Sequence, residues 1–216
     1  MQRLLLALLA LSLTAAVCKA DLVTIDPGNH PQPGDEENIF FDQPGLIDSG
    51  MTVQGAAHSG AVLDFTANEP IVAAAHGQAR ITAAAADSGF TDMTIHSTTG
   101  VFFSDFIFNV HTVGNASGTL TDTVDLAKGG PVVENFKLDN GENFFTILAA
   151  SGEDITSVNL SSSVDLNSIE QARLSGIGSP SGSGSGSGGT RTPEPASMLL
   201  LGSGLLGLGT HFRKHK

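Results

Sequence analysis

Short runs of alternating hydrophobic and polar residues fill the middle of this 216-residue chain. In one run Phe106, Phe108 and Val110 share one face of an extended chain, while Ile107 and Asn109 share the other. Such a period of two is typical of a β-strand. Glycine, asparagine, aspartate, serine and proline interrupt the runs about every eight to twelve residues, as in antiparallel sandwiches and barrels. The pattern therefore predicts an all-β domain, an antiparallel, jelly-roll-like β-sandwich.

Strands are predicted throughout the segment 21–178. The Ala-rich stretch 72–89 is the one place that favours a helix, but Gly77 interrupts it and residues 78–82 alternate, so a strand is predicted there too. The predicted strands are 22–25, 39–41, 52–54, 61–66, 78–83, 93–96, 102–110, 118–126, 134–138, 143–149, 155–161 and 170–177.

Asn140 and Gly141 predict a hairpin between the strands 134–138 and 143–149. An Asn-Gly pair supplies the two positive φ angles that a type I′ turn requires. A second turn at 150–154 leads to the next alternating run. The sequence thus predicts that the three strands form a meander.

The first 20 residues are predicted to be a secretory signal peptide. Arg3 precedes an apolar run at 4–17, which is shorter than the roughly 20 residues of a membrane span. Cleavage by signal peptidase after Ala20 would make Asp21 the first residue of the mature chain. Since Cys18 is the only cysteine, the mature protein would contain no disulfide.

The chain ends in a Ser/Gly-rich linker, 179–191, and an apolar segment with positive charge behind it. The composition of the linker predicts a flexible tether. Residues 196–212, as a helix, would rise about 25 Å at 1.5 Å per residue and cross a membrane with slight thinning. Basic residues stay on the cytoplasmic side of a membrane, so the basic cluster behind the apolar segment, which we call the basic stop, would lie in the cytoplasm and the acidic domain outside. The stop consists of Arg213, Lys214 and Lys216.

Residues 192–216 resemble a PEP-CTERM sorting signal, in which a Pro-Glu-Pro motif, a Leu/Gly-rich transmembrane helix and a basic cluster follow one another. The motif consists of Pro193, Glu194 and Pro195. The resemblance implies a Gram-negative bacterium and recognition of these three residues by the protease exosortase. It also implies a precursor tethered in the inner membrane, and then delivery to the cell surface or the extracellular matrix.

Parts of the predicted domain are also similar to β-rich domains found in such proteins. The similar segments are 77–81, 142–147 and 169–176. This similarity implies no particular activity.

The charge of the segment 21–178 excludes nucleic acid as a partner. This segment contains 21 acidic and four basic residues, a net charge of −17. Nucleic-acid binding requires a basic surface that neutralises phosphates.

No motif in the sequence indicates catalysis, so we expect no enzyme. The histidines of the domain are scattered, and neither H-E-x-x-H nor G-x-S-x-G occurs. The chain has no Trp and no Tyr, which leaves only Phe to stack on sugar rings. We expect a structural or exopolysaccharide-associated protein. A secreted hydrolase of exopolysaccharide is the alternative, since two carboxylates suffice for a glycosidase.

Acidic turns make calcium a candidate ligand, and no other cofactor is expected. They lie at 35–37, at Asp139 with Glu142, and at 153–154. Calcium takes its six to eight oxygen ligands from such loops, although none has the spacing of a helix-loop-helix calcium site. The other interpretation is that the charge keeps the protein soluble. The metal ligands, if any, are not identified by the sequence.

Overall fold

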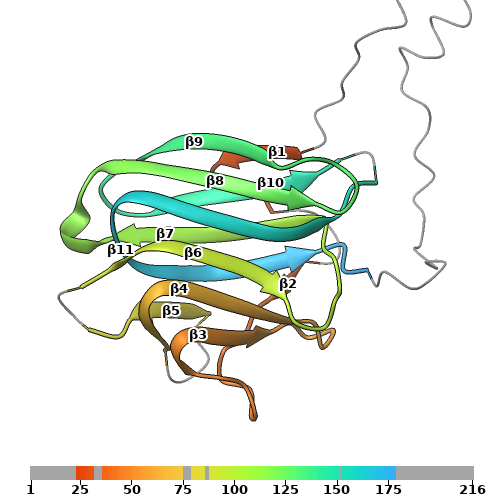
Figure 1. Ribbon diagram of the computed structural model, residues 1–216, viewed down its shortest axis with the longest axis horizontal. Helices are drawn as coiled ribbons and strands as arrows, with labels where there is room; N and C mark the ends of the chain where they lie inside the picture. The colour runs from red at the N-terminus through yellow and green to blue at the C-terminus, as the bar shows by residue number, and fades with distance from the viewer. Residues whose placement is uncertain (1–22, 32–35, 75–78, 86–87, 151, 179–216) are drawn as a thin grey trace, which may run out of the picture. The chain divides into compact units, whose positions relative to one another are not determined.

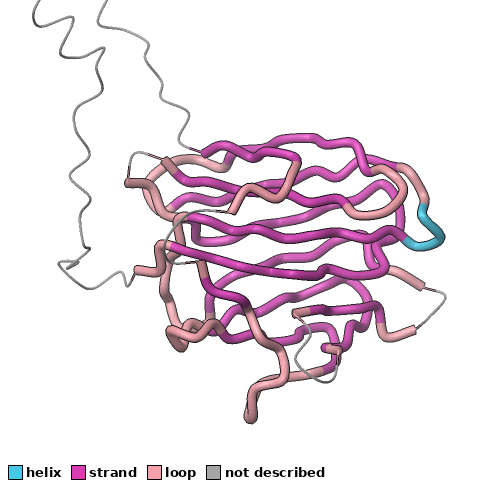
Figure 2. The backbone as a smooth tube through the Cα atoms, turned by 180° about the vertical axis from the view of Figure 1, so that it is seen from behind, coloured by secondary structure: helices cyan, strands magenta, loops and turns pink. Residues whose placement is uncertain are grey.

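The computed structural model describes residues 23–31, 36–74, 79–85, 88–150 and 152–178. This part of the chain consists of β-strands and loops, with one short 3-10 turn at Val113–Asn115 (Figure 1, Figure 2). The all-β prediction is therefore confirmed. The predicted signal peptide, linker and sorting tail lie outside the described residues.

The strands follow the predicted ones closely, because alternation and turn residues mark most of them. The predicted strand 39–41 differs: a two-residue strand precedes it, and only Phe40 makes an isolated bridge there. The strands are β1 (Val23–Pro27), β2 (Glu37–Asn38), β3 (Ser49–Ala56), β4 (Val62–Ala73), β5 (Arg80–Ala83), β6 (Phe90–Ser97), β7 (Asp105–Thr112), β8 (Gly118–Leu126), β9 (Val132–Leu138), β10 (Asn143–Ala149) and β11 (Ile155–Ser175).

The strands pair in two groups, an arrangement that fits a β-sandwich (Figure 1). In the first sheet the order is β9, β8, β11, β6, β4 and β3. In the second sheet the order is β1, β10, β7, β11 and β5. Strands β4 and β11 take part in both sheets, since β4 also pairs with β5. The inward side chains of both sheets form one hydrophobic core.

One long strand, β11, replaces the two predicted strands 155–161 and 170–177. Its first part pairs with β6 and β8, and its second part pairs with β5 and β7. Register shifts around Leu166 and a positive φ at Gln171 mark bulges, which bend a strand without ending it. The polar stretch between the two predicted strands resembles a turn in sequence, but it is the bend at which β11 changes sheets.

The predicted hairpin at Asn140 and Gly141 is wrong, and so is the meander. Strand β9 pairs with β8, whereas β10 pairs with β1 and β7, so the turn joins the two sheets. Gly141 has φ +103°, but Asn140 is not among the described residues with positive φ, as a type I′ turn would require. The reason for the crossing is the core: Phe136 and Phe145 pack with their ring centroids 5.3 Å apart.

Phenylalanine rings fill much of the core between the sheets. Phe41 packs edge-on against Phe65 at 5.2 Å, and Phe106 stacks on Phe108 at the same distance. Gly55 of β3 faces this core and leaves room for the ring of Phe41. A side chain at position 55 would therefore compete with a ring that is already buried.

Replacing Gly55 by alanine is expected to lower the free energy of unfolding by roughly 1–3 kcal/mol, because the core has no space for another methyl group. A Cβ atom there would lie 2.6 Å from Cε1 of Phe41 and would also overlap Ile39. Denaturant unfolding measures the effect. Gly130→Ala is the matched control, since nothing lies within 4 Å of a Cβ atom at that position. Equal stability of the two variants would contradict the prediction.

Candidate functional site

The described residues 28–31 and Glu36, between β1 and β2, contact part of the outer face of the second sheet. The hydroxyl of Thr146 donates to the carbonyl of Gly28 at 2.9 Å and accepts from the backbone N–H of His30 at 3.1 Å. Arg173 on β11 forms an ion pair with Glu36 at 3.1 Å. Thr146 is fully buried, although it points away from the core. Around Thr146 and Arg173, this face is therefore not open to a large ligand.

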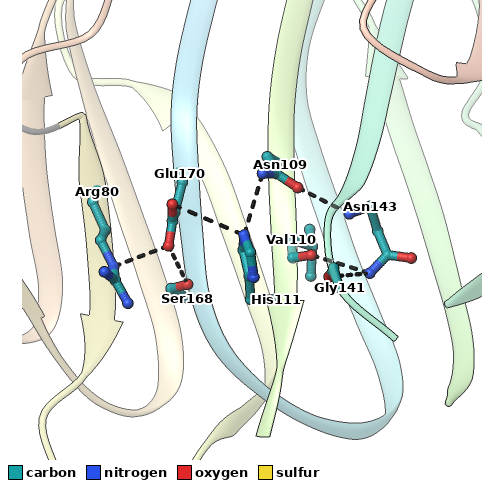
Figure 3. A network of polar contacts seen from close by, with 8 residues as sticks. All are labelled: Arg80, Asn109, Val110, His111, Gly141, Asn143, Ser168 and Glu170. Carbon is teal, nitrogen blue, oxygen red and sulfur yellow. Dashed lines mark hydrogen bonds and ion pairs between the residues drawn. The ribbon is translucent and has the colours of Figure 1, made fainter. Parts of the chain in front are cut away.

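A row of polar side chains crosses this sheet beside the covered part (Figure 3). Arg80 and Glu170 form an ion pair, with 3.0 Å between Nε and Oε1. The angle at Nε does not allow a hydrogen bond. The hydroxyl of Ser168 donates to the same carboxylate at 2.9 Å, and Nε2 of His111 lies 3.9 Å from Oε2. Ser168 is fully buried. Because it is buried, the hydroxyl of Ser168 is not placed to attack a substrate as a nucleophile would. Its role is to hold the carboxylate of Glu170.

The other end of the row fixes the turn between β9 and β10. The buried carboxamide of Asn109 lies 3.3 Å from Nε2 of His111 and accepts the backbone N–H of Asn143 at 2.9 Å. The side-chain oxygen of Asn143 accepts the N–H of Asp139 at 2.8 Å. Because its polar atoms are all engaged within the protein, Asn143 has a structural role. Its amide nitrogen donates to the carbonyls of Val110, Asp139 and Gly141.

A pocket of about 360 Å³ opens next to this turn. It contains two carboxylates, of Asp139 and Glu142, and the partly exposed ring of Phe144. Asp139 forms an ion pair with Lys137, in which both side chains are largely exposed. Carboxylates and a ring in one pocket are groups that contact sugars. The lining residues are Pro27, Gly28, Asn29, Lys137, Asp139, Glu142, Asn143, Phe144 and Phe145.

On the outer face of the first sheet, the outward side chains of β8, β6 and residues 155–162 of β11 are partly or fully exposed and polar, whereas β3 and β4 add Ala56, Val62 and the exposed Met51. At the centre of this face, one carboxylate oxygen of Asp125 on β8 accepts hydrogen bonds from Ser157 and Asn159 on β11. The carboxamide of Asn159 in turn accepts the hydroxyl of Thr94 on β6 at 2.8 Å. We call the outward side chains of β8, β6, β4, β3 and residues 155–162 of β11 the polar face.

Hydrogen bonds continue across the polar face on both sides of this centre. On β6, Asp92 accepts the hydroxyl of Ser161 at 2.9 Å. On β4, Asp64 accepts the amide of Gln54 at 2.9 Å and lies 3.9 Å from Nε2 of His96. Such cross-strand pairs hold the groups in fixed positions. The polar face is therefore an ordered array of hydroxyl, carboxamide and carboxylate groups.

Asp122 is the ionisable residue with the most unusual surroundings, but it faces the core. It lies on β8 between the inward-facing Leu120 and Val124, and neither of its carboxylate oxygens has a hydrogen-bond partner among the described residues. Burial raises the pKa of the Asp122 carboxyl to about 7. Because it is fully buried, Asp122 does not contact a ligand on either outer face.

The residues that the sequence selects for sorting and processing lie outside the described part of the chain. They are Ala20, Asp21, Pro193, Glu194, Pro195, Arg213, Lys214 and Lys216. Within the described residues no helix is long and apolar enough to cross a membrane.

Three acidic residues of the turns proposed for calcium are engaged within the protein, Glu36, Glu37 and Asp139, and Asp35 lies outside the described residues. Glu36 pairs with Arg173, and Glu37 accepts the backbone N–H of Ser59 at 2.7 Å. In the described ranges no group of three or more His, Cys, Asp and Glu side chains is placed to hold a metal ion. None of the site residues predicted from the sequence lies on the polar face. Alternating Thr, Ser and Asn residues on β8 and β11 are the signal that could have indicated it.

Comparison with known families places a PEP-CTERM protein-sorting motif at residues 191–214. Searches of the curated proteins and of the solved structures find no match. The motif confirms the predicted sorting tail and marks a protein that is exported, processed by exosortase and delivered to the cell surface.

Proposed function

We propose that this exosortase-sorted protein acts without catalysis at the cell surface or in the extracellular matrix, where its polar face binds polysaccharide. The observation that carries this proposal is the ordered array of polar groups on an uncovered sheet, in a protein exported to the cell surface. A polysaccharide presents many hydroxyl groups, and each finds donors and acceptors on such an array.

The fixed positions of these groups favour binding. Asn159 is hydrogen-bonded on both sides, to Asp125 and to Thr94. Side chains that are already ordered lose less conformational entropy when a ligand binds. Binding by hydrogen bonds also suits a chain without Trp and Tyr, which lacks the large rings that stack on sugars.

The proposed path to the surface has two cleavages. Signal peptidase cuts between Ala20 and Asp21, and the helix 196–212 then tethers the precursor in the inner membrane. The basic stop holds the end of the chain in the cytoplasm until exosortase removes the tail. The domain 21–178 leaves the membrane with its linker.

A secreted hydrolase is the second candidate function, and the pocket beside Phe144 is the observation that favours it. Asp139 and Glu142 both line that pocket. A glycosidase needs two carboxylates, one on each side of the scissile bond.

Incubation of the processed protein with the exopolysaccharide of the producing cells separates the two functions. We expect saturable binding and no release of reducing ends, with binding at least fivefold weaker in Asn159→Ala and unchanged in Glu142→Gln. If the wild-type protein released reducing ends and the variants Asp139→Asn and Glu142→Gln did not, the result would support the hydrolase and overturn the binding function. Repeating the titration with calcium and with a chelator tests whether calcium is a ligand, since a bound ion would make binding depend on it.

A further inference from the structure

We infer that the polar face selects a polysaccharide that carries positively charged amino groups, such as a de-N-acetylated hexosamine polymer. This inference rests on the proposed function and names the chemical class of its ligand. It follows from the charge that the face carries, from the way its carboxylates are held, and from the polar side chains of its central strands.

The carboxylates of the polar face are held by neutral donors. Asp125 accepts from Ser157 and Asn159, and Asp92 accepts from Ser161. These hydrogen bonds fix each carboxylate and leave its negative charge in place. Asp64 differs only in that His96 lies 3.9 Å away, the one titratable base among the described side chains of the face.

The positive charges of the domain are engaged with other groups, and one of them, Lys137, lies on β9 at the edge of the first sheet. Arg80 pairs with Glu170, Arg173 with Glu36, and Lys137 with Asp139. The remaining cation, Lys128, donates to a backbone carbonyl at 3.0 Å. Strands β8, β6, β4 and β3 and residues 155–162 of β11 contain neither Lys nor Arg. A cationic ligand therefore complements the charge of the polar face better than a neutral or an anionic one.

The polar face is a poor surface for a basic protein partner. The outward side chains of β8, β6 and residues 155–162 of β11 include no aliphatic or aromatic residue. Protein interfaces depend on a few apolar or aromatic anchors that fill pockets in the partner. An extended polysaccharide needs only hydrogen-bond partners at its hydroxyl groups, and its ammonium groups form charge-assisted hydrogen bonds with carboxylates.

Titration of the full-length chain with three oligosaccharide probes tests the inference. The probes are a glucosamine oligomer, its N-acetylated counterpart of equal length, and an oligomer of uronic acids. Measurements are made at about pH 6, where carboxylates are ionised and amines protonated. We expect the glucosamine oligomer to bind at least tenfold more tightly than the N-acetylated one, and the preference to decrease with added salt, as for complementary charges.

The variant Asp64→Asn, Asp92→Asn, Asp125→Asn keeps one side-chain oxygen acceptor at each position of the polar face and removes three charges. We expect it to lose the preference for the glucosamine oligomer and to keep its affinity for the N-acetylated one. The matched control, Asp26→Asn, Asp42→Asn, Glu134→Gln, removes three exposed charges away from the polar face and is expected to keep the preference.

Each other outcome contradicts a different part of the argument. Equal binding of the amino and N-acetylated oligomers would overturn the inference and leave the polysaccharide function standing. Binding of the uronic acid oligomer in the presence of calcium would also overturn it, because a bridging metal would then supply the positive charge. Absence of binding by all three probes would overturn the inference, while titration with the exopolysaccharide of the producing cells decides the proposed function separately. If the control variant also lost the preference for the glucosamine oligomer, the preference would come from the net charge of the chain and not from the polar face, which would overturn the inference.

Discussion

Replacing Asp122 by asparagine is expected to raise the free energy of unfolding by as much as roughly 4 kcal/mol above pH 7, and by little at about pH 4. The carboxyl has an ordinary pKa of 3.8, and burial raises its pKa to about 7 in the folded protein. Each pH unit between these values is worth about 1.4 kcal/mol. Asparagine has nearly the same shape and stays neutral, so the variant removes the cost of a buried charge.

The sign of the pH dependence follows from linkage. Because the folded-state pKa is raised, the contribution of Asp122 to stability is fully present below about pH 3.8 and is lost as the pH rises to about 7. The difference between variant and wild type should therefore grow across this interval and stay constant above it. Denaturant unfolding at a series of pH values measures it.

Asp125→Asn is the matched control, since Asp125 lies three residues further along β8 and points to solvent with its hydrogen bonds made. We expect that variant to leave the shape of the stability curve unchanged. Glu134, opposite Asp122 on β9, is exposed and provides no compensating cation. A difference between Asp122→Asn and wild type that does not vary with pH would show that the carboxyl is solvated or paired.

Replacing Pro193, Glu194 and Pro195 by alanine is expected to stop removal of the sorting tail almost completely. These residues form the recognition motif of the matched segment, so without them exosortase should not engage the chain. The protein would keep its apolar segment 196–212 and stay with the membrane, and its amount at the cell surface would fall at least tenfold. Mass spectrometry of the C-terminal peptide and cell fractionation measure both effects.

Wild-type protein in cells without exosortase should give the same intact C-terminus, which separates recognition from folding. Replacing Thr192 by alanine is the local control, because Thr192 lies next to the motif and outside it. If wild-type protein kept Lys216 in cells with active exosortase, the tail would be an ordinary membrane anchor and the processing would be disproved.

Local sequence determined most of the strands. Strands β8 and β10 have the predicted bounds, because β8 alternates and both runs are rich in β-prone residues and bounded by turn residues. The sorting motif was predictable for a different reason: a protease reads it as a short linear sequence, so no tertiary contact is needed to define it.

Pairing between strands was not predictable in the same way. The Asn-Gly turn predicted a hairpin, but a local turn sequence does not state which sheet the next strand joins. That choice was made by the packing of Phe136 against Phe145 and by the hydrogen bonds that join Asn143 to Asn109 and Val110 on β7. For the same reason the sequence divided β11 into two strands, since the bulges that bend it are stabilised by partners distant in the chain.

The sequence by itself thus determined the class of the fold, the net negative charge of the domain and the sorting tail, because each depends on residues close together in the chain. The tertiary structure decided where the charge is neutralised. Lys and Arg pair with carboxylates on and beside the second sheet, and the carboxylates of the polar face are left with neutral donors. It also decided that Asp122 faces the core. Both results depend on strands that are far apart in sequence and adjacent in space, and the free energy of a charge depends on the groups that surround it in space.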